Sequence, residues 1–561
     1  MIRPGVRADG EPVDVLVVGL GPVGAAVANL LGRYGIRTLV VDKADGIFMA
    51  PRAIALDNEA LRVLQMAGLE DDAFAKVRIP RVRMRSPMFG DYAVADTSIE
   101  VDELPMLVTF YQPELEHVLR KRLGNYPSVE VRTGVELVGL EQDAKAVTAR
   151  LNSIAGSETV RAAYLVAADG ASSVVRNLLG IPFEGRSYAE DWLIVDAKSC
   201  ANPIDDVEFW CDPARPGPRM IAPGGRQRWE FMMKPGESAS DMERDSVARE
   251  LLRRSIADAE FEVERVAVYR FHARTADRFS NGRCHLVGDA AHITPPFAGQ
   301  GLVSGLRDAA NLCWKLAWVL RGRASPAILD SYHVERRPHA IACINFALFL
   351  GGLVMPRSRV KAALVHGAML FTGKIPGLRD RFRRLEMKPK NQFREGLFLS
   401  KGPASKFQPG AHLPQVGLRS AGKRKVQRSD DILGDRMILL GFGCDPAKSI
   451  EPALAERWIA AGGGFVELRE PRSPVVAATS FVDMTGTLVP GVASKDWVAL
   501  VRPDRAIVAD GPAANAGALV RSTLEMMGAP NARKPIPASP ADKLHSAGGK
   551  GAERKLVMRS P

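Results

Sequence analysis

The hydrophobic pattern opens with strand and helix periods in close alternation. Residues 14–18 are apolar as in a buried strand, a helical pattern follows a glycine turn, and "RTLVVD" indicates a second strand that ends at Asp42. Apolar residues three and four apart return in "NEALRVLQMAGL" and "QPELEHVLRKRL", which predicts two helices. Residues 129–169 then alternate as strands do. This order predicts an α/β domain.

The pattern changes near Trp192. Short strands such as "VEFWC" and "RWEFMMK" indicate a second, largely antiparallel sheet that reaches Phe271. The stretch "CHLVGD" predicts one more strand, and residues 302–320 carry an apolar helical face. Towards the C-terminus, "DRMILLGFG", "GFVELRE" and "DWVALVRPDRAIVAD" indicate strands of a separate α/β domain.

Composition adds the class and compartment of the protein to this picture. A chain of 561 residues is expected to hold roughly three domains, and 46% hydrophobic with 25% charged residues is typical of a soluble globular protein. The cysteines show no CxxC spacing and no clustering with histidines. They indicate reduced thiols in a cytoplasmic protein, and they give no support for a disulfide framework or a metal site.

The net charge of +12 is unevenly distributed along the chain. Residues 371–428 hold 15 Lys/Arg against 3 Asp/Glu, and residues 529–561 hold 7 against 2, so the remainder is mildly acidic. Solvated basic segments are the favoured interpretation, and adhesion to nucleic acid or to a membrane is the alternative. We expect no nucleic-acid partner, because no aromatic residues are interleaved with the basic ones in the way that is typical of a nucleic-acid-binding surface.

The most apolar run, residues 341–355, is too short for a membrane span of ~20 residues. It also contains Asn345 and ends at Pro356. A buried helix is therefore expected here, and no transmembrane segment. The first 12 residues have no apolar core, so no secretory signal is expected either.

The first glycine turn, "GLGPVG", has the spacing and context of a dinucleotide site. Gly19 would permit the tight turn, Gly21 would let a pyrophosphate approach the backbone, and Gly24 would let the helix pack on the strand. The helix N-terminus faces the phosphates, and Asp42 would accept a ribose hydroxyl. This turn alone leaves open whether the nucleotide is NAD or FAD.

A second turn some 270 residues later favours FAD. Asp289 would end the strand "CHLVGD", and Gly299, Gln300 and Gly301 would begin the long helix from Leu302. A helix start carries free N–H groups and partial positive charge, which would stabilise the anionic edge of a reduced flavin. The two turns would thus hold the two ends of one long cofactor.

Three motifs in order, "GLGPVG", "DGASSVVR" and "GDAAHITPPFAGQGL", resemble the single-component (class A) flavin-dependent aromatic hydroxylases. Further matches include "PRAIALDNEALRVLQMAGL", "CDPARP", "RWEFM" and "YHVERRPHA", so the resemblance covers residues 14 to about 345. Several of these stretches are most similar to the 3-(3-hydroxyphenyl)propionate hydroxylase branch. The C-terminal "DWVALVRPDRAIVADG" is similar to the thioredoxin-like domain of the phenol hydroxylase branch, although without a CxxC a redox role is not expected.

The resemblance implies an α/β (α+β overall) architecture of three domains. A Rossmann-like FAD-binding domain would be formed by residues 12–190 and 276–370, with an inserted antiparallel substrate sheet at 191–275. A basic linker (371–428), a thioredoxin-like domain (429–528) and a disordered tail (529–561) would follow.

The resemblance also implies site roles. The residues that would hold FAD are Gly19, Gly21, Gly24, Asp42, Arg52, Gln112, Asp169, Gly170, Arg176, Asp289, Gly299, Gln300, Gly301, Leu302 and Val303. Of these, Asp169 and Gly170 would also bind the reducing nicotinamide nucleotide. Catalytic roles fall to Arg52, His292, Pro295 and Pro296, and substrate contacts to Trp229, Phe231 and Phe297. The alternatives are a surface role for Arg52, a turn cap at Asp169, a packed or capping His292, and plain strand core at Trp229 and Phe231.

One position departs from the family pattern. The family usually has Asn directly after "GQGL", where it contacts the flavin pyrimidine edge, and this chain has Val303. If the backbone N–H makes that contact, little is lost. If the side chain makes it, the flavin potential or position is altered.

The activity implied is hydroxylation of a phenolic compound with NAD(P)H and O2, through a C4a-hydroperoxyflavin. A small aromatic molecule and O2 are then the expected partners, and a homodimer is allowed. One alternative is the same scaffold acting on a polyketide, antibiotic or quinone, including Baeyer-Villiger-type oxygen insertion. Another is a flavoprotein that binds FAD without oxygenating anything, for which Val303 is the sequence argument.

Overall fold

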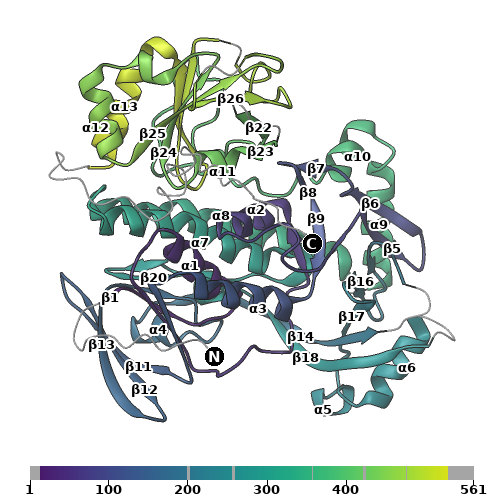
Figure 1. The fold of residues 1–561 in the computed structure, drawn as a ribbon. Coiled ribbons are helices and arrows are strands. Elements are labelled where there is room, and N and C mark those ends of the chain that lie inside the picture. Colours follow the sequence, from purple (N-terminus) through teal and green to yellow (C-terminus); the bar gives the residue numbers. More distant parts are fainter. Residues whose placement is uncertain are drawn as a thin grey trace, which may run out of the picture.

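Three large sheets make up the molecule in the computed structural model (Figure 1). The structure describes residues 13–198, 203–255, 260–356, 358–420, 425–474, 477–493 and 495–528. Cys200 and the tail predicted to be disordered, residues 529–561, lie outside the described residues.

The first sheet carries the N-terminal glycine turn at the end of its central strand. Its order is β10-β2-β1-β13-β12-β11, and β20 pairs with β13 and with β19. From β10 to β13, and on to β20, neighbouring strands are parallel, whereas β12 and β11 are antiparallel. The strands are β1 (Val13–Val18), β2 (Thr38–Asp42), β10 (Val129–Thr133), β11 (Glu136–Gln142), β12 (Val147–Ser153), β13 (Gly156–Ala167), β19 (Ser280–Asn281) and β20 (Cys284–Leu286). The predicted Rossmann-like domain is confirmed.

Two helices that begin at the glycine turns pack on each other beside this sheet. Helix α1 (Pro22–Arg33) contacts both α7 (Gln300–Leu320) and α3 (Gln112–Arg122). Small residues permit the close approach, since a Cβ on Gly305 of α7 would lie 2.6 Å from the Val23 side chain of α1. Helix α7 begins two residues before the predicted start at Leu302, because Gly299 serves as its N-cap.

The second sheet is larger than predicted. Its order is β21-β18-β14-β17-β16-β15-β5-β6, and the only parallel pair among its described strands is β15 with β5. Strands β5 and β6 pair with this second sheet, although they lie within the range 12–190 predicted for the FAD-binding domain. The strands are β5 (Arg81–Ser86), β6 (Gly90–Asp96), β14 (Phe183–Lys198), β15 (Val207–Trp210), β16 (Gly217–Ala222), β17 (Arg226–Met232), β18 (Glu262–Ala276) and β21 (His292–Ile293).

Smaller elements connect these sheets. A three-stranded sheet has the order β3-β9-β4, and β7 pairs with β8. Helices α5 and α6 cover one face of the second sheet, and α9 and α10 lie beside β6. Their bounds are β3 (Ala55–Asp57), α2 (Asn58–Met66), β4 (Lys76–Arg78), β7 (Glu100–Val101), β8 (Leu104–Pro105), β9 (Leu107–Phe110), α4 (Val174–Leu178), α5 (Ala239–Met242), α6 (Asp245–Ser255), α8 (Asp330–Val354), α9 (Arg359–Thr372) and α10 (Pro376–Arg383).

The C-terminal domain has a mixed sheet of order β23-β22-β26-β25-β24-β27-β28. Strands β25-β24-β27-β28, at one side of this sheet, combine one parallel and two antiparallel pairs, with α12 joining β24 to β25. The thioredoxin-like assignment of this domain stays a prediction. Strands β22 and β23 come from the predicted linker, which therefore ends earlier than residue 428. The elements are β22 (Gly417–Ser420), β23 (Gln427–Arg428), α11 (Ser429–Leu433), β24 (Met437–Phe442), α12 (Pro452–Ala460), β25 (Gly463–Arg469), β26 (Ser480–Asp483), β27 (Trp497–Val501), β28 (Ile507–Pro512) and α13 (Ala516–Met526).

Buried ion pairs fix the C-terminal domain to α7 and α8. The Arg502 guanidinium donates to Glu335 at 2.6 and 2.9 Å, and Lys315 of α7 donates to the same carboxylate at 2.8 Å. These cations hold the pKa of Glu335 well below its usual range, although burial opposes them. Such pairs stabilise only when every member is present, because an unpaired buried charge is costly.

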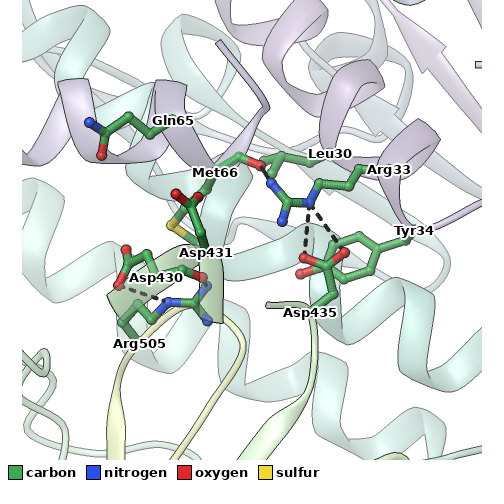
Figure 2. A pocket seen from close by; sticks show the side chains of 9 residues that line it. All are labelled: Leu30, Arg33, Tyr34, Gln65, Met66, Asp430, Asp431, Asp435 and Arg505. Carbon is green, nitrogen blue, oxygen red and sulfur yellow. Dashed lines mark hydrogen bonds and ion pairs between the residues drawn. The ribbon is translucent and has the colours of Figure 1, made fainter. Parts of the chain in front are cut away.

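A small cavity at the same interface is bounded by further ion pairs (Figure 2). Arg33 of α1 faces Asp435 at 3.1 Å, and Arg505 faces Asp430 at 3.2 Å. The Arg33–Asp435 pair joins the two domains, whereas Arg505 and Asp430 both belong to the C-terminal domain. Because residues of both domains line the cavity, it belongs to the domain interface.

One helix among the described residues is apolar enough by length and composition to cross a membrane. It spans Pro326–Val354, and its most apolar stretch of 18 residues has a mean hydropathy of 1.4 and is 39% buried. Glu335 and Arg336 on this helix are buried in ion pairs, and Ala340, Cys343 and Ala347 are buried apolar residues. These positions are those of a core helix with one exposed face.

Candidate functional site

The first glycine turn is shaped for a close approach to its backbone. Gly19 has φ +99°, and a Cβ there would lie 2.4 Å from the Ala168 carbonyl oxygen, while a Cβ on Gly24 would lie 2.0 Å from the Gly19 oxygen. Gly21, in contrast, has no atom within 4 Å of the place of a Cβ. It is the N-cap of α1 and has no side-chain cap. Free N–H groups therefore face open space, as a phosphate site requires.

Asp42 lies beside this turn at the end of β2. Its carboxylate accepts hydrogen bonds from the backbone N–H of Leu20 at 2.6 Å and of Ala44 at 2.8 Å. The side chain thus holds the turn itself in shape. A contact with a ribose hydroxyl, predicted from sequence, stays a prediction.

Three residues far apart in the sequence meet beyond the turn. Gln112 Oε1 accepts from the backbone N–H of Arg52 at 3.0 Å and of Ala53 at 2.9 Å. The Arg52 guanidinium lies 3.9 Å from Asp289 Oδ2, and the two side chains are 61% and 37% exposed. Arg52 and Asp289 therefore open into one space, with Gln112 fixing the backbone of the arginine.

The "DG" motif lies next to this space at the end of β13. Asp169 Oδ2 accepts from the Val175 N–H at 3.1 Å, whereas its Oδ1 is buried without a hydrogen-bond partner among the described residues. Burial raises the pKa of this carboxyl. Gly170 follows with φ +79°. An orphaned carboxylate oxygen is the kind of atom that a bound ribose hydroxyl would satisfy.

Arg176 connects the "DG" motif with the segment that follows Asp289. Its guanidinium donates to the Ala290 and Ala171 carbonyls, both at 2.9 Å, and lies 3.8 Å from the Phe183 ring centroid. Arg176 thus fixes the segment after Asp289 against the "DG" motif, and its predicted contact with the cofactor stays a prediction.

The second turn presents an open helix start. Gly299, with φ +61°, is the N-cap of α7 and leaves it without a side-chain cap. A Cβ on Gly301 would meet only the Thr294 carbonyl oxygen, at 4.0 Å. The Gln300 side chain turns away, since its Nε2 donates to Asp57 at 3.2 Å and its Oε1 accepts from Arg307. Any contact of Gln300 with a cofactor would thus use its backbone.

Val303 does not face the open end of α7. Its side chain is 0% exposed and belongs to the main hydrophobic core, while Leu302 is partly buried against that core. Valine is therefore suited to this position, and only the backbone N–H of residue 303 is available at the helix start. This burial favours the alternative in which the backbone N–H of residue 303 makes the flavin contact, and that contact stays a prediction.

His292 is embedded in a buried network. Its Nε2 lies 2.7 Å from Asp308 Oδ2, and Asp308 also accepts from the Gly288 N–H at 3.0 Å and from Arg336 at 2.9 Å. The ring packs beside Phe279 with a centroid distance of 5.6 Å. These contacts match the alternative of a packed histidine that fixes the loop, and a catalytic role stays a prediction.

Pro295, Pro296 and Phe297 lead from the second turn into an aromatic cluster. Pro295 is buried and Pro296 is exposed. The Phe297 ring lies 5.7 Å from Trp192 and 6.0 Å from both Phe271 and Tyr188, centroid to centroid. This cluster lies on the face of the second sheet that meets the second turn.

Trp229 and Phe231 lie on the opposite face of the same sheet. Side chains alternate along a strand, and both pack with Met242 of α5 and Leu252 of α6. The structure thus separates them from Phe297 and matches the alternative of plain strand core, while their assignment to the substrate stays a prediction. The sequence shows alternation, but it does not show which face of a strand meets the cofactor.

The residue between them, Glu230, was missed. It lies on the face of the Phe297 cluster, is 4% exposed, and its carboxylate has no hydrogen-bond partner among the described residues. Burial raises its pKa to about 7, against which Arg228 and Arg265 act. A buried carboxyl that titrates near neutral pH is suited to proton transfer.

The neighbours of Glu230 tie this face to the Arg52 segment. Arg228 donates to Asp196 at 2.7 Å, to the Arg52 carbonyl at 3.0 Å and to the Pro51 carbonyl at 3.0 Å. Arg265 donates to Pro51 O at 2.7 Å and to Asp196 at 3.3 Å. The two arginines pair with Asp196 and not with Glu230. They also bind the backbone of the Arg52 segment, whose guanidinium lies 3.9 Å from Asp289.

Comparisons with known proteins agree with this geometry. Residues 12–347 match the FAD binding domain family, and residues 410–526 match the HcaD C-terminal domain family. A 3-(3-hydroxy-phenyl)propionate/3-hydroxycinnamic acid hydroxylase from Burkholderia vietnamiensis is 37% identical, over 88% of this chain and 93% of the relative.

Solved structures show the same fold. The flavin-dependent monooxygenase PieE, in complex with FAD and substrate, has a TM-score of 0.77 at 23% identity and covers 93% of this chain and 100% of its own. The p-nitrophenol 4-monooxygenase PnpA from Pseudomonas putida DLL-E4 has a TM-score of 0.62 at 27% identity, over 69% of this chain and 100% of its own.

The fold and the two glycine turns define a flavoprotein monooxygenase. The chain belongs to the class A FAD-dependent aromatic hydroxylases, in the branch of the 3-(3-hydroxyphenyl)propionate hydroxylases. Its cofactor is FAD, and NAD(P)H is the co-substrate typical of this family.

The described residues fit FAD at both ends. The open N-terminus of α1 at Gly21 suits the pyrophosphate, and the orphaned oxygen of Asp169 with the exposed carboxylate of Asp289 suits hydroxyls of the cofactor. The open start of α7 suits the pyrimidine edge of a reduced flavin. Among the described residues, no group of His, Cys, Asp and Glu is arranged to hold a metal ion.

Proposed function

We propose that this enzyme transfers one oxygen atom of O2 to the ring of a small phenolic acid of the hydroxyphenylpropionate class, in the cytoplasm. The observation that carries the proposal is the 37% identity to a hydroxylase named for this substrate class, over 93% of that relative's length. The matched length extends over most of the chain, since it covers 88% of it.

Bound FAD supplies the redox chemistry, taking a hydride from NAD(P)H and activating O2 once reduced. The work left to the chain is binding, orientation, exclusion of water and proton transfer. Gly19, Gly21 and the start of α1 would hold the pyrophosphate, and Arg52, Gln112 and Asp289 would position the chain that leads to the flavin ring. The start of α7 would stabilise negative charge on that ring.

The aromatic cluster would form the wall on which the substrate ring stacks. Phe297 is 5% exposed and is supported from behind by α8, where a Cβ on Gly351 would lie 2.9 Å from its ring. The Phe297 ring is inclined at 67° to Trp192 and at 88° to Phe271. An apolar cluster of such rings favours contact with another aromatic ring, edge to face or stacked, and excludes water from it.

Glu230 would accept the proton of the substrate hydroxyl. A phenolate is a better nucleophile than a phenol at the ring carbon that receives oxygen, so a base near the hydroxyl speeds the transfer. Glu230 shares a sheet face with the aromatic cluster, and its carboxylate is unpaired among the described residues. Arg228 and Arg265 beside it would stabilise the negative charge that remains.

Other substrate classes have weaker support. PieE shares the fold at 23% identity, which says nothing about the substrate of this chain. The non-oxygenating alternative depended on Val303, whose side chain is in the core.

The test is NAD(P)H oxidation by the FAD-loaded enzyme with a panel of compounds. We expect 3-(3-hydroxyphenyl)propionate to stimulate oxidation strongly and to yield a dihydroxylated product. Phenol, which lacks the acid, and a polycyclic quinone serve as comparisons. A quinone or polyketide that outperforms every phenolic acid would overturn the substrate class, and flavin reduction without any oxygenated product would overturn the monooxygenase assignment.

A further inference from the structure

Helix α9 exposes a row of large apolar side chains that the proposed reaction does not use. Val360, Leu364 and Phe371 are 72%, 69% and 67% exposed. At 100° per residue, positions 360, 364 and 371 fall on one narrow stripe of the helix. The opposite side of α9 is buried through Ala362 and His366, and the His366 ring stacks on Tyr92 of β6 at 4.2 Å. The stripe is therefore held outward by a well-packed helix.

Two neighbouring segments widen this stripe into a patch. The turn between β5 and β6 places Met88, 56% exposed, and Phe89, 36% exposed, beside the helix, since a Cβ on Gly367 would lie 3.8 Å from Phe89 Cζ. Leu378 of α10 is 46% exposed. The α9 patch consists of Met88, Phe89, Val360, Leu364, Phe371 and Leu378. It lies at the edge of the molecule beside β5 and β6 (Figure 1).

The rim of the α9 patch is strongly basic. Residues 359–384 contain 7 Lys/Arg and 1 Asp/Glu, and all of these basic residues are exposed. Arg379, Arg381 and Arg383 pair with Asp380, Glu386 and Asp96. The other basic residues of this range are Arg359, Lys361, Lys374 and Arg384. Large exposed apolar side chains with a basic rim are the features of helices that lie in the interface of an anionic lipid bilayer. Each basic residue is attracted by the negative surface potential, and the apolar residues enter the acyl boundary.

The charge also argues against a second copy of this chain as the occupant. A twofold dimer places the same patch against itself, so two strongly basic rims would face each other. Their repulsion opposes the apolar gain at the centre. An anionic lipid surface satisfies both the apolar centre and the basic rim.

We propose that the α9 patch docks this enzyme on anionic lipid surfaces. The inner sides of α9 and α10 contribute Met369, Leu370 and Phe382 to the hydrophobic cluster that contains Phe297 and Trp192. Docking therefore places the lipid on the outer side of the helices that cover the aromatic wall. The proposal concerns binding alone and holds whichever substrate the enzyme takes.

The experiment is co-flotation of the FAD-loaded full-length protein with vesicles. Vesicles of phosphatidylcholine alone are compared with vesicles that also contain phosphatidylglycerol. We expect binding to the anionic vesicles only, and weaker binding as salt screens the basic rim. Failure to bind anionic vesicles at low salt would overturn the proposal.

Paired variants assign the binding to the α9 patch. The double variants Leu364→Ser/Phe371→Ser and Lys374→Glu/Arg379→Glu should each lose at least about tenfold in vesicle affinity, the first from the apolar centre and the second from the rim. Ile154→Ser is the matched control, because Ile154 is exposed on a turn of the FAD-binding domain outside the patch. NAD(P)H oxidation by all three should equal that of the wild type. Unchanged vesicle binding in either double variant, or a dimer in solution that Leu364→Ser/Phe371→Ser dissolves, would overturn the proposal.

Discussion

The substitution Glu230→Gln removes one ionisation from a buried site while keeping the shape of the side chain. In the folded protein, burial raises the pKa of Glu230 from 4.5 to about 7. The charged groups that face it are Arg228 and Arg265, which lower its pKa, and Asp196, which raises it. At about 1.4 kcal/mol per pKa unit, forming the carboxylate in the folded state costs about 3 kcal/mol relative to the unfolded chain.

Proton linkage gives the direction in which the stability of the fold changes with pH. Because the folded pKa is above the unfolded one, this group stabilises the fold fully below the unfolded pKa, and the stability is lost as pH rises through about 7. Glutamine does not titrate. The free energy of unfolding of Glu230→Gln, minus that of the wild type, should therefore grow by about 2–3 kcal/mol between about pH 5 and about pH 8.

Two assays check this reasoning. Denaturant unfolding of both FAD-loaded proteins at the two pH values gives the difference in stability. The pH profile of kcat/KM gives the functional part: the wild type should gain activity through an inflection near the pKa of about 7, and the variant should be slow and lack it. A stability difference that does not change with pH would refute the raised pKa. A variant with the wild-type pH profile would refute the role of Glu230 as proton acceptor.

Three further predictions concern the cofactor and the domain interface. Gly21→Ala should fold normally, because its Cβ meets no atom within 4 Å, but should bind FAD at least about tenfold more weakly by titration, whereas Gly24→Ala should lower the melting temperature itself; equal FAD affinity in Gly21→Ala would contradict the phosphate site. Arg52→Ala should slow anaerobic reduction by NAD(P)H in stopped-flow measurements, and wild-type reduction kinetics would count against its role beside Asp289. Arg502→Met should cost about 3–5 kcal/mol of unfolding free energy, since Glu335 and Asp504 stay buried without this partner. Arg244→Met, which removes an exposed ion pair, is the control and should cost under about 1 kcal/mol. Equal losses in the two variants would contradict a stabilising role for the buried ion pairs at the domain interface.

Local patterns predicted the geometry of the two glycine turns. A glycine turn can be recognised from a few neighbouring residues, because a positive φ or a close helix contact excludes other side chains. This holds for the glycines at 19, 21 and 24 and for the turn at 299–301. The meeting of Arg52, Gln112 and Asp289 followed only from the family resemblance. No spacing within this one sequence joins positions 52, 112 and 289.

Predicting the substrate-binding residues required knowing which face of β17 meets the cofactor. The side chains of Trp229, Glu230 and Phe231 alternate between the two faces of β17. Helices α5 and α6 cover the face of Trp229 and Phe231, and Glu230 lies on the face of the aromatic cluster. A buried acidic residue between two apolar ones was the available signal, since a buried carboxyl is rare without a partner.

Long-range pairing explains the errors in domain boundaries. Strands β5 and β6 join a sheet whose other strands begin near residue 183, and β22 joins β26 across about 60 residues. The local sequence of residues 81–96 does not indicate with which sheet these strands pair. Val303 is a similar case, because its place in the core depends on how α7 is rotated against the first sheet.

The most direct test of the central claim is a single turnover with isotopically labelled O2. The FAD-loaded enzyme is reduced with NAD(P)H, mixed with 3-(3-hydroxyphenyl)propionate and labelled O2, and the product is analysed by mass spectrometry. A flavin monooxygenase that acts on this class of phenol should give a dihydroxylated product that carries one labelled oxygen atom. Reduced flavin that reoxidises to give only hydrogen peroxide, with the phenolic acid unchanged, would contradict the account.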